Sequence, residues 1–247
     1  MKNDRYQDSI SRRGFVSMAS SILSGGIFLL AVPQTVQAEE IYGGSRSATI
    51  SWYSGTASSR MSWQSGVYVA YHSSLSFSHS CEPGSVRCSL TIIDPPGTYA
   101  AINDYYNRAR GKKFDASVFC YEPENYSGAF YGSGAWSIPD YAGFTVSSPS
   151  ISCVVNSAQL VEITQESVSP SVHSCGGERL LPVVGASGKP GFIFAQSLEP
   201  FGGASTVEDL EEMVSRGFRS VDVYDESGDS IVDKFFIGCR YLDVIES

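Results

Sequence analysis

Hydrophobic and polar residues alternate over short runs along most of the chain, which is the pattern of half-buried β-strands. The clearest run is 74–78, where serines flank Leu75 and Phe77. Aromatic and β-branched residues enrich the neighbouring runs, and turn-forming residues separate them. The pattern predicts strands at residues 48–53, 66–71, 74–78, 88–93, 114–120, 128–136, 180–186, 192–198, 220–224 and 230–237.

Two segments show the spacing of an amphipathic helix instead. The first follows the turn sequence at 94–97, and a helix is expected over 98–110 with Ile102, Tyr105 and Tyr106 on one face. In the second, Ser205 and Glu208 have the spacing of a capping box, and Gly217 is a natural C-terminal stop. Its apolar stripe consists of Val207, Leu210, Met213 and Val214.

The order of these elements divides the chain. Residues 39–155 are predicted to form a β-rich, sandwich-like domain, and the polar segment 156–177 a linker or connecting strand. Residues 178–247 give the order strand-strand-helix-strand-strand. The expected fold class is therefore mainly β with α+β, combining a β-rich sandwich-like N-terminal domain with a small ββαββ C-terminal domain.

The first 38 residues have the features of an export signal. Arg12 and Arg13 follow Ser11 and precede Phe15, and a weakly apolar stretch diluted by serine and glycine continues over 15–32. This arrangement is typical of a twin-arginine signal peptide, which is an address read by a receptor. We therefore expect a bacterial protein that is exported by the twin-arginine translocase.

Val36 and Ala38 predict cleavage by signal peptidase between Ala38 and Glu39. A membrane anchor and an ordinary secretory signal are the competing interpretations. The cleavage motif and the polar dilution of the apolar stretch favour removal, so we expect no stable membrane span after cleavage. The mature protein is then expected to be secreted or held at the cell surface.

Charge and cysteine content narrow the possibilities. The chain has 17 Lys+Arg and 26 Asp+Glu, a formal net charge of −9, with the acidic excess after residue 156. Nucleic acid and anionic lipid repel such a chain, so we expect neither as a partner. An even number of cysteines outside the membrane predicts three disulfides and no free thiol. The six are Cys81, Cys88, Cys120, Cys153, Cys175 and Cys239.

No two cysteines have the C-x-x-C spacing of a zinc site, an iron–sulfur cluster or a redox pair. The sequence leaves the pairing of the cysteines open. A turn between Cys81 and Cys88 makes a bridge between them geometrically reasonable. Cys175 and Cys239 bracket the C-terminal unit, and we expect them to pair.

Three stretches of the C-terminal part carry a resemblance. They are GKPGF at 188–192 with 197–198, TVEDL at 206–210, and VYDESG at 223–228 leading into 235–237. Together, over about residues 178–239, they resemble an uncharacterised module of exported or membrane-tethered bacterial proteins. The resemblance implies export and no particular activity, and Cys239 departs from it.

A second set of residues lies upstream. VYVAYH at 67–72, His79 and PGTYA at 96–100 are similar to lactococcin-type bacteriocins, which are small secreted β-rich proteins. This resemblance implies a secreted antagonist. The six cysteines and the long C-terminal extension depart from the bacteriocin pattern.

Few residues have the spacing of a metal or catalytic site. His72 and His79 lie near Cys81, but an odd separation places the two histidines on opposite faces of a straight strand. Ser, His and Cys are adjacent within 171–177, yet triad residues meet in space rather than in sequence, and no G-x-S-x-G elbow occurs. We therefore expect no metal, cofactor or catalytic residue.

Three further groups have a simpler explanation than a site. Asp225, Ser227 and Asp229 alternate like calcium ligands but lack the spacing of an EF-hand, so a hairpin turn is favoured. Trp52, Trp63 and Trp136 could stack on sugars, but such residues are mostly core in a strand-rich domain. A basic cluster could bind an anionic wall polymer, although a solvated helix end is favoured. This cluster consists of Arg108, Arg110, Lys112 and Lys113.

The sequence thus favours a non-enzymatic protein that binds a partner in the cell envelope or extracellular space. A bacteriocin-like antagonist is the alternative. A hydrolase with an unfamiliar site ranks third, because it requires a polar cleft that joins a histidine, a carboxylate and a nucleophile.

Overall fold

β-Strands dominate the fold, as predicted. The computed structural model describes residues 39–64, 67–121, 128–141, 143–155, 173–175, 177–204 and 206–246. Arg12, Arg13, Phe15 and Ala38 lie outside these residues, as does most of the expected linker, so export, cleavage and the linker stay predictions.

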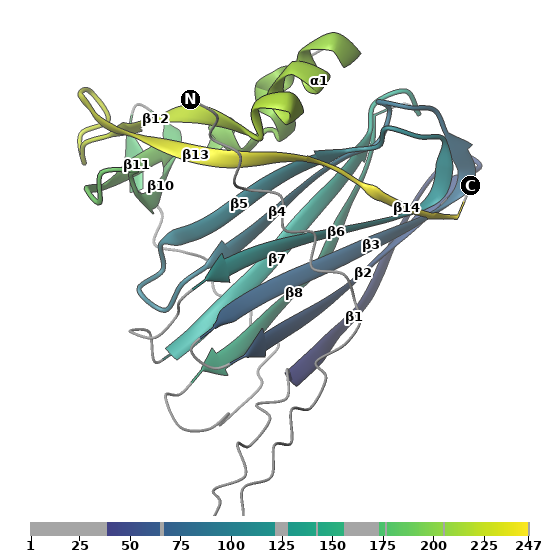
Figure 1. Cartoon of the computed structure of the whole chain (residues 1–247), viewed down its shortest axis with the longest axis horizontal. Coiled ribbons are helices and arrows are strands. Elements are labelled where there is room, and N and C mark those ends of the chain that lie inside the picture. The colour runs from purple at the N-terminus through teal and green to yellow at the C-terminus, as the bar shows by residue number, and fades with distance from the viewer. Residues whose placement is uncertain are drawn as a thin grey trace, which may run out of the picture. The chain divides into compact units, whose positions relative to one another are not determined.

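The described strands form two sheets (Figure 1). The first, sheet A, has the order β1 (Glu39–Ile50), β2 (Tyr53–Gln64), β3 (Tyr68–Cys81), β6 (Gly111–Tyr121) and β14 (Asp243–Glu246). The second, sheet B, has the order β8 (Phe144–Val155), β7 (Gly128–Ile138), β4 (Arg87–Ile93), β5 (Tyr99–Tyr106), β13 (Ile231–Tyr241), β12 (Phe218–Tyr224), β11 (Pro190–Phe194), β10 (Glu178–Val184) and β9 (His173–Cys175).

Sheet A packs against β8, β7, β4 and β5 to form a sandwich. Alternate residues of these strands point inward and build a shared apolar core that includes Trp136. The Trp136 Nε1–H donates to Ser73 Oγ at 2.8 Å, and Tyr71 OH donates to the Pro149 carbonyl at 2.7 Å. These bonds satisfy the polar atoms of two large buried rings and tie β3 to β7 and β8.

Strand β5 also closes a small barrel. It runs parallel to β13, and one further parallel pairing joins Tyr99 to Val183 of β10. The ring β5–β13–β12–β11–β10 encloses a second apolar core, which includes Ile193, Val223 and Ile237. The order β10, β11, α1 (Val207–Arg216), β12, β13 confirms the ββαββ unit. Two 3₁₀ turns, η2 (Ala195–Leu198) and η3 (Pro200–Gly203), precede α1.

The cap of α1 lies one residue later than the sequence suggested. Thr206 Oγ1 accepts a hydrogen bond from Asp209 N at 3.1 Å, so Thr206 and not Ser205 is the N-cap. Gly217 ends the helix in the left-handed conformation, with φ 81°, as expected.

The barrel is joined to the sandwich through shared strands and one buried ion pair. Beyond β13, strand β14 pairs with β6 of sheet A. Arg219 of β12 donates from Nε to Asp104 Oδ2 of β5 at 2.7 Å, and Asp104 is fully buried. Burial raises the pKa of Asp104, and the positive charge of Arg219 opposes this rise. Strands of residues 39–155 and 178–247 therefore share both sheets.

The predicted helix over 98–110 is wrong, because this segment contains β5 and the turn that follows it. The backbone groups of β5 form hydrogen bonds with β4 on one edge and with β13 on the other. Thr98 N donates to Asp94 Oδ1 at 2.7 Å and so closes the preceding turn instead of capping a helix. The strand predicted at 48–53 is also interrupted, since Ser51 and Trp52 form the turn between β1 and β2.

The described cysteines are not bridged to one another. Cys81, Cys88, Cys120, Cys153 and Cys239 are all free thiols. Cys81 pairs with Gly111 in sheet A, whereas Cys88 pairs with Tyr105 in sheet B. The chain crosses between the sheets at this point, so the expected hairpin is absent there. The side chain of Cys175 lies outside the described residues, but Cys239 is one of the free thiols, so the expected bridge between Cys175 and Cys239 is absent from the structure.

Candidate functional site

The outward face of sheet A carries a regular array of polar side chains. Side chains alternate between the two faces of a strand. The residues of β2, β3 and β6 that point away from the core therefore form rows across neighbouring strands. The central row is Arg60, His72 and Ser117, and the next row toward the β1–β2 turn is Ser58, Ser74 and Asp115.

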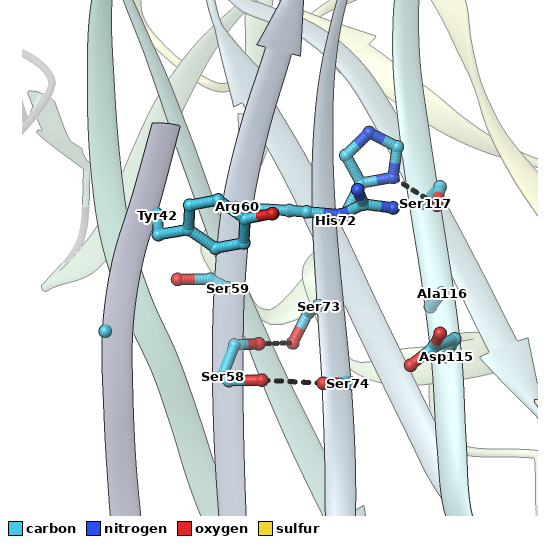
Figure 2. Close-up of a pocket in the computed structure, with 11 residues that line it drawn as sticks. Tyr42, Ser58, Ser59, Arg60, His72, Ser73, Ser74, Asp115, Ala116 and Ser117 are labelled. Carbon is cyan, nitrogen blue, oxygen red and sulfur yellow. Dashed lines mark hydrogen bonds between the residues drawn. The ribbon is translucent and has the colours of Figure 1, made fainter. Parts of the chain in front are cut away.

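A groove of about 390 Å³ lies over these two rows (Figure 2). Short serine side chains form its floor, while longer ones such as Tyr42 and Arg60 stand above them. Ser58 Oγ and Ser74 Oγ are hydrogen-bonded at 2.6 Å across β2 and β3. The sheet therefore presents a shallow hollow whose floor consists largely of hydroxyl groups.

His72 is fixed at one end of the groove by two serines. Its Nε2 is hydrogen-bonded to Ser62 Oγ at 2.8 Å and its Nδ1 to Ser117 Oγ at 2.7 Å. A neutral imidazole donates from one ring nitrogen and accepts at the other. The hydrogen-bonded series Ser62–His72–Ser117 therefore orients the hydroxyls on β2 and β6. The three side chains are thus held in one arrangement before any ligand arrives.

The row of His72 continues toward β1 with Arg60 and then Tyr42, and Arg60 is the cation that lines the groove. Arg60 Nη1 donates to Glu40 Oε1 at 2.8 Å, and Tyr42 OH donates to Glu40 Oε2 at 3.3 Å. The pairing compensates the charge of Arg60 and fixes its position beside Tyr42. The Tyr42 ring is 71% exposed, which leaves an aromatic surface open to solvent at the groove.

Beyond His72, the polar face changes into a cluster of aromatic rings, the aromatic end, formed by Tyr68, Phe119 and Tyr121. The Phe119 and Tyr121 rings are stacked, with centroids 5.8 Å apart and an angle of 12° between their planes. Tyr68 meets Phe119 at 5.8 Å and His72 meets it edge-on at 5.9 Å. Tyr121 is 65% exposed, so the rings form an open platform continuous with the groove.

The residues predicted as alternatives from the sequence do not gather into a site. His79 packs among the rings of Tyr53, Phe77 and Tyr141, away from the hydrogen bonds of His72. Within the described part of the chain, no group of three or more His, Cys, Asp or Glu side chains could hold a metal ion. The hairpin turn at 226–229 is confirmed, with Asp225 accepting from neighbouring groups of its own turn.

The basic cluster lies at a strand turn rather than at a helix end. Arg108 lies over the ring of Tyr241 at 5.3 Å, and Arg110 pairs with Glu82 at 3.4 Å. Lys112 and Lys113 are successive residues of β6 and so point to opposite faces of the sheet. The four cations therefore do not form one anion-binding surface.

The tryptophans are divided between the core and the surface. Trp63 and Trp136 are core residues, as expected, whereas Trp52 is 81% exposed in the β1–β2 turn. None of the three belongs to the groove.

Comparison with protein-family models gave no match, and comparison with curated proteins found no similar protein. Among the residues that the structure describes, no helix has the length and apolar character needed to cross a membrane. The site must therefore be interpreted from its own chemistry.

Sequence reasoning missed most residues of this site. The signal was present as polar residues at every second position of 56–64, and as Asp115 and Ser117 followed at the same spacing by Phe119 and Tyr121. Only the register of β2, β3 and β6 shows that these two series share one face of the sheet, on either side of β3.

Proposed function

We propose that this chain is an exported, non-catalytic binding protein of the cell envelope or extracellular space, and that its ligand occupies the groove of sheet A. The observation that carries the proposal is the ordered chain Ser62–His72–Ser117 along a groove with further hydroxyls on its floor. Polar groups held in fixed positions lose little conformational entropy on binding, which favours affinity.

Binding accounts for the geometry better than hydrolysis does. In a catalytic triad a carboxylate orients the histidine through its second ring nitrogen. Here a serine hydroxyl is hydrogen-bonded to each ring nitrogen of His72, at 2.8 and 2.7 Å. The backbone N–H groups of β3 are used in ladders with β2 and β6, so they do not supply an oxyanion hole.

The proposed location rests on the arginine pair. Every described strand lies C-terminal to the expected cleavage site, so cleavage there would remove none of them. The twin-arginine translocase and signal peptidase would be transient partners. The resemblances to the exported module and to bacteriocins stay predictions.

A sedimentation assay with isolated cell envelopes tests the proposal. We expect the exported protein to sediment with envelopes or with a polymer extracted from them, and the double variant His72→Ala, Ser117→Ala to lose this association. The control is Thr91→Ala, Ser133→Ala, which removes a hydroxyl pair bonded at 2.8 Å on sheet B. Equal sedimentation of all three folded proteins would contradict a role of the groove.

A further inference from the structure

We propose that the ligand is a neutral oligosaccharide that lies along β3 and β6, from the aromatic end to Asp115. This inference rests on the proposed function, because it assigns a ligand class to the same groove. The observation behind it is that an open aromatic platform and a row of ordered hydroxyls share one sheet face and one direction.

The aromatic end matches the apolar surface of a sugar ring. One side of many pyranose rings presents C–H groups, which pack against the face of an aromatic side chain. Phe119 and Tyr121 are near-parallel to each other, and Tyr121 is 65% exposed. The rings lie at the C-terminal end of β6, and an exposed apolar patch of this kind often marks a binding surface.

The groove matches the polar edge of the same sugars. Sugar hydroxyls both donate and accept hydrogen bonds, and so do the serine hydroxyls of the floor. Ser117 is held by His72 at 2.7 Å, and Ser58 and Ser74 are held by each other at 2.6 Å. Each hydroxyl retains further bonding capacity for a ligand, since a hydroxyl has one donor and two acceptor positions.

The dimensions favour a chain of sugars over a single one. Tyr121 and Asp115 lie on the same face of β6 and six residues apart, which corresponds to about 20 Å along a strand. This length accommodates several rings in a row. A monosaccharide would contact either the platform or the hydroxyl floor, whereas an oligosaccharide contacts both.

Two features disfavour other ligand classes. An extended peptide binds to a sheet by adding a strand at an edge, whereas the groove lies on the sheet face over β2 and β3, whose backbone groups are paired on both sides. An anionic polymer would need uncompensated cations, whereas Arg60 is paired with Glu40 at 2.8 Å. The formal net charge of −9 also opposes an anionic ligand.

Titration calorimetry with oligosaccharides of increasing length tests the inference. The probes are chito-, cello- and malto-oligosaccharides of one to six units, with oligogalacturonate as the anionic comparison. We expect at least one neutral series to bind with affinity that rises with length and then levels off. Phe119→Ala and Tyr121→Ala should each weaken binding about tenfold, while folding is unchanged.

A matched control is available on the barrel. Phe218 and Phe236 are another exposed aromatic pair, with ring centroids 5.0 Å apart on β12 and β13, and their replacement by alanine should leave binding unchanged. Binding of oligogalacturonate alone, or of no saccharide, would overturn the oligosaccharide assignment. If the His72→Ala, Ser117→Ala variant still lost envelope association in that case, the groove would remain a binding site for another ligand class.

Discussion

The ion pair between Asp104 and Arg219 offers the sharpest test of how the barrel is attached to the sandwich. Asp104 Oδ2 accepts from Arg219 Nε at 2.7 Å and from Phe201 N at 2.8 Å. Arg219 Nη2 donates to the carbonyls of Ser197 and Glu199, at 2.9 Å each. Asp104→Ala removes the acceptor shared by β12 and η3, and Arg219→Ala removes the only charge that faces this carboxylate in the described contacts.

Burial sets the size of the expected effect. The Asp104 side chain is 0% exposed and that of Arg219 is 9% exposed, so neither charge is compensated by water once its partner is gone. Removal of one member of such a pair costs about 3–5 kcal/mol of unfolding free energy. Asp104→Asn keeps an oxygen for the Phe201 amide and should cost less than Asp104→Ala.

Urea unfolding of the two alanine variants and of the double variant measures this coupling. Because both single changes break the same contact, the double variant should lose less than the sum, with a coupling free energy of about 0.5–3 kcal/mol. Limited proteolysis should cut first between residues 178 and 246. Single losses below about 1 kcal/mol, or strictly additive losses, would refute the role assigned to the pair.

Four further predictions concern other parts of the molecule. A Cβ atom at Gly132 would lie 2.2 Å from the buried ring of Tyr71, so Gly132→Ala should cost about 1–3 kcal/mol in urea unfolding, and an unchanged midpoint would refute this packing. Burial raises the pKa of Cys153 to about 12, so between about pH 9 and 12 the unfolded state loses this proton first and stability falls as pH rises. Cys153→Ala should flatten that fall by up to about 1.4 kcal/mol per pH unit, and identical pH profiles would contradict it. Titration of the denatured, unreduced protein should detect the thiols of the four sandwich cysteines, whereas finding none would show that disulfides form after export. Arg12→Lys with Arg13→Lys should abolish export, and undiminished secretion would rule out the twin-arginine assignment.

Local signals made the C-terminal elements predictable from sequence. The helix α1 has an apolar stripe, a capping residue and Gly217, all within one short segment. Segment 98–110 has a comparable helical stripe but folds as β5, because neighbouring strands occupy both of its edges. Ile102 then faces the barrel core and Tyr105 the sandwich core, so the apparent stripe serves two cores. Pairing with neighbouring strands overrides the local helix propensity, and the sequence of the segment itself does not indicate this pairing.

The candidate site was harder to predict for a related reason. In the sequence His79 lies nearest to His72, but the hydrogen-bond partners of His72 are Ser62 of β2 and Ser117 of β6. A one-residue change in register would send these serines to the opposite face. The alternation of each strand could be predicted from the sequence, whereas the register between strands depends on packing that a single sequence does not display.

The pairing of β14 with β6 has a consequence for the timing of folding. Val244 lies opposite Phe114, so the fifth strand of sheet A is supplied only after most of the chain has been synthesised. The barrel likewise cannot close until β13 has been synthesised and has paired with β5. Contacts between such distant segments fold slowly, and an emerging chain would expose the incomplete edge of β6 until then. For a protein that crosses the membrane already folded, as we propose, this arrangement makes the completed C-terminal strands a requirement for export.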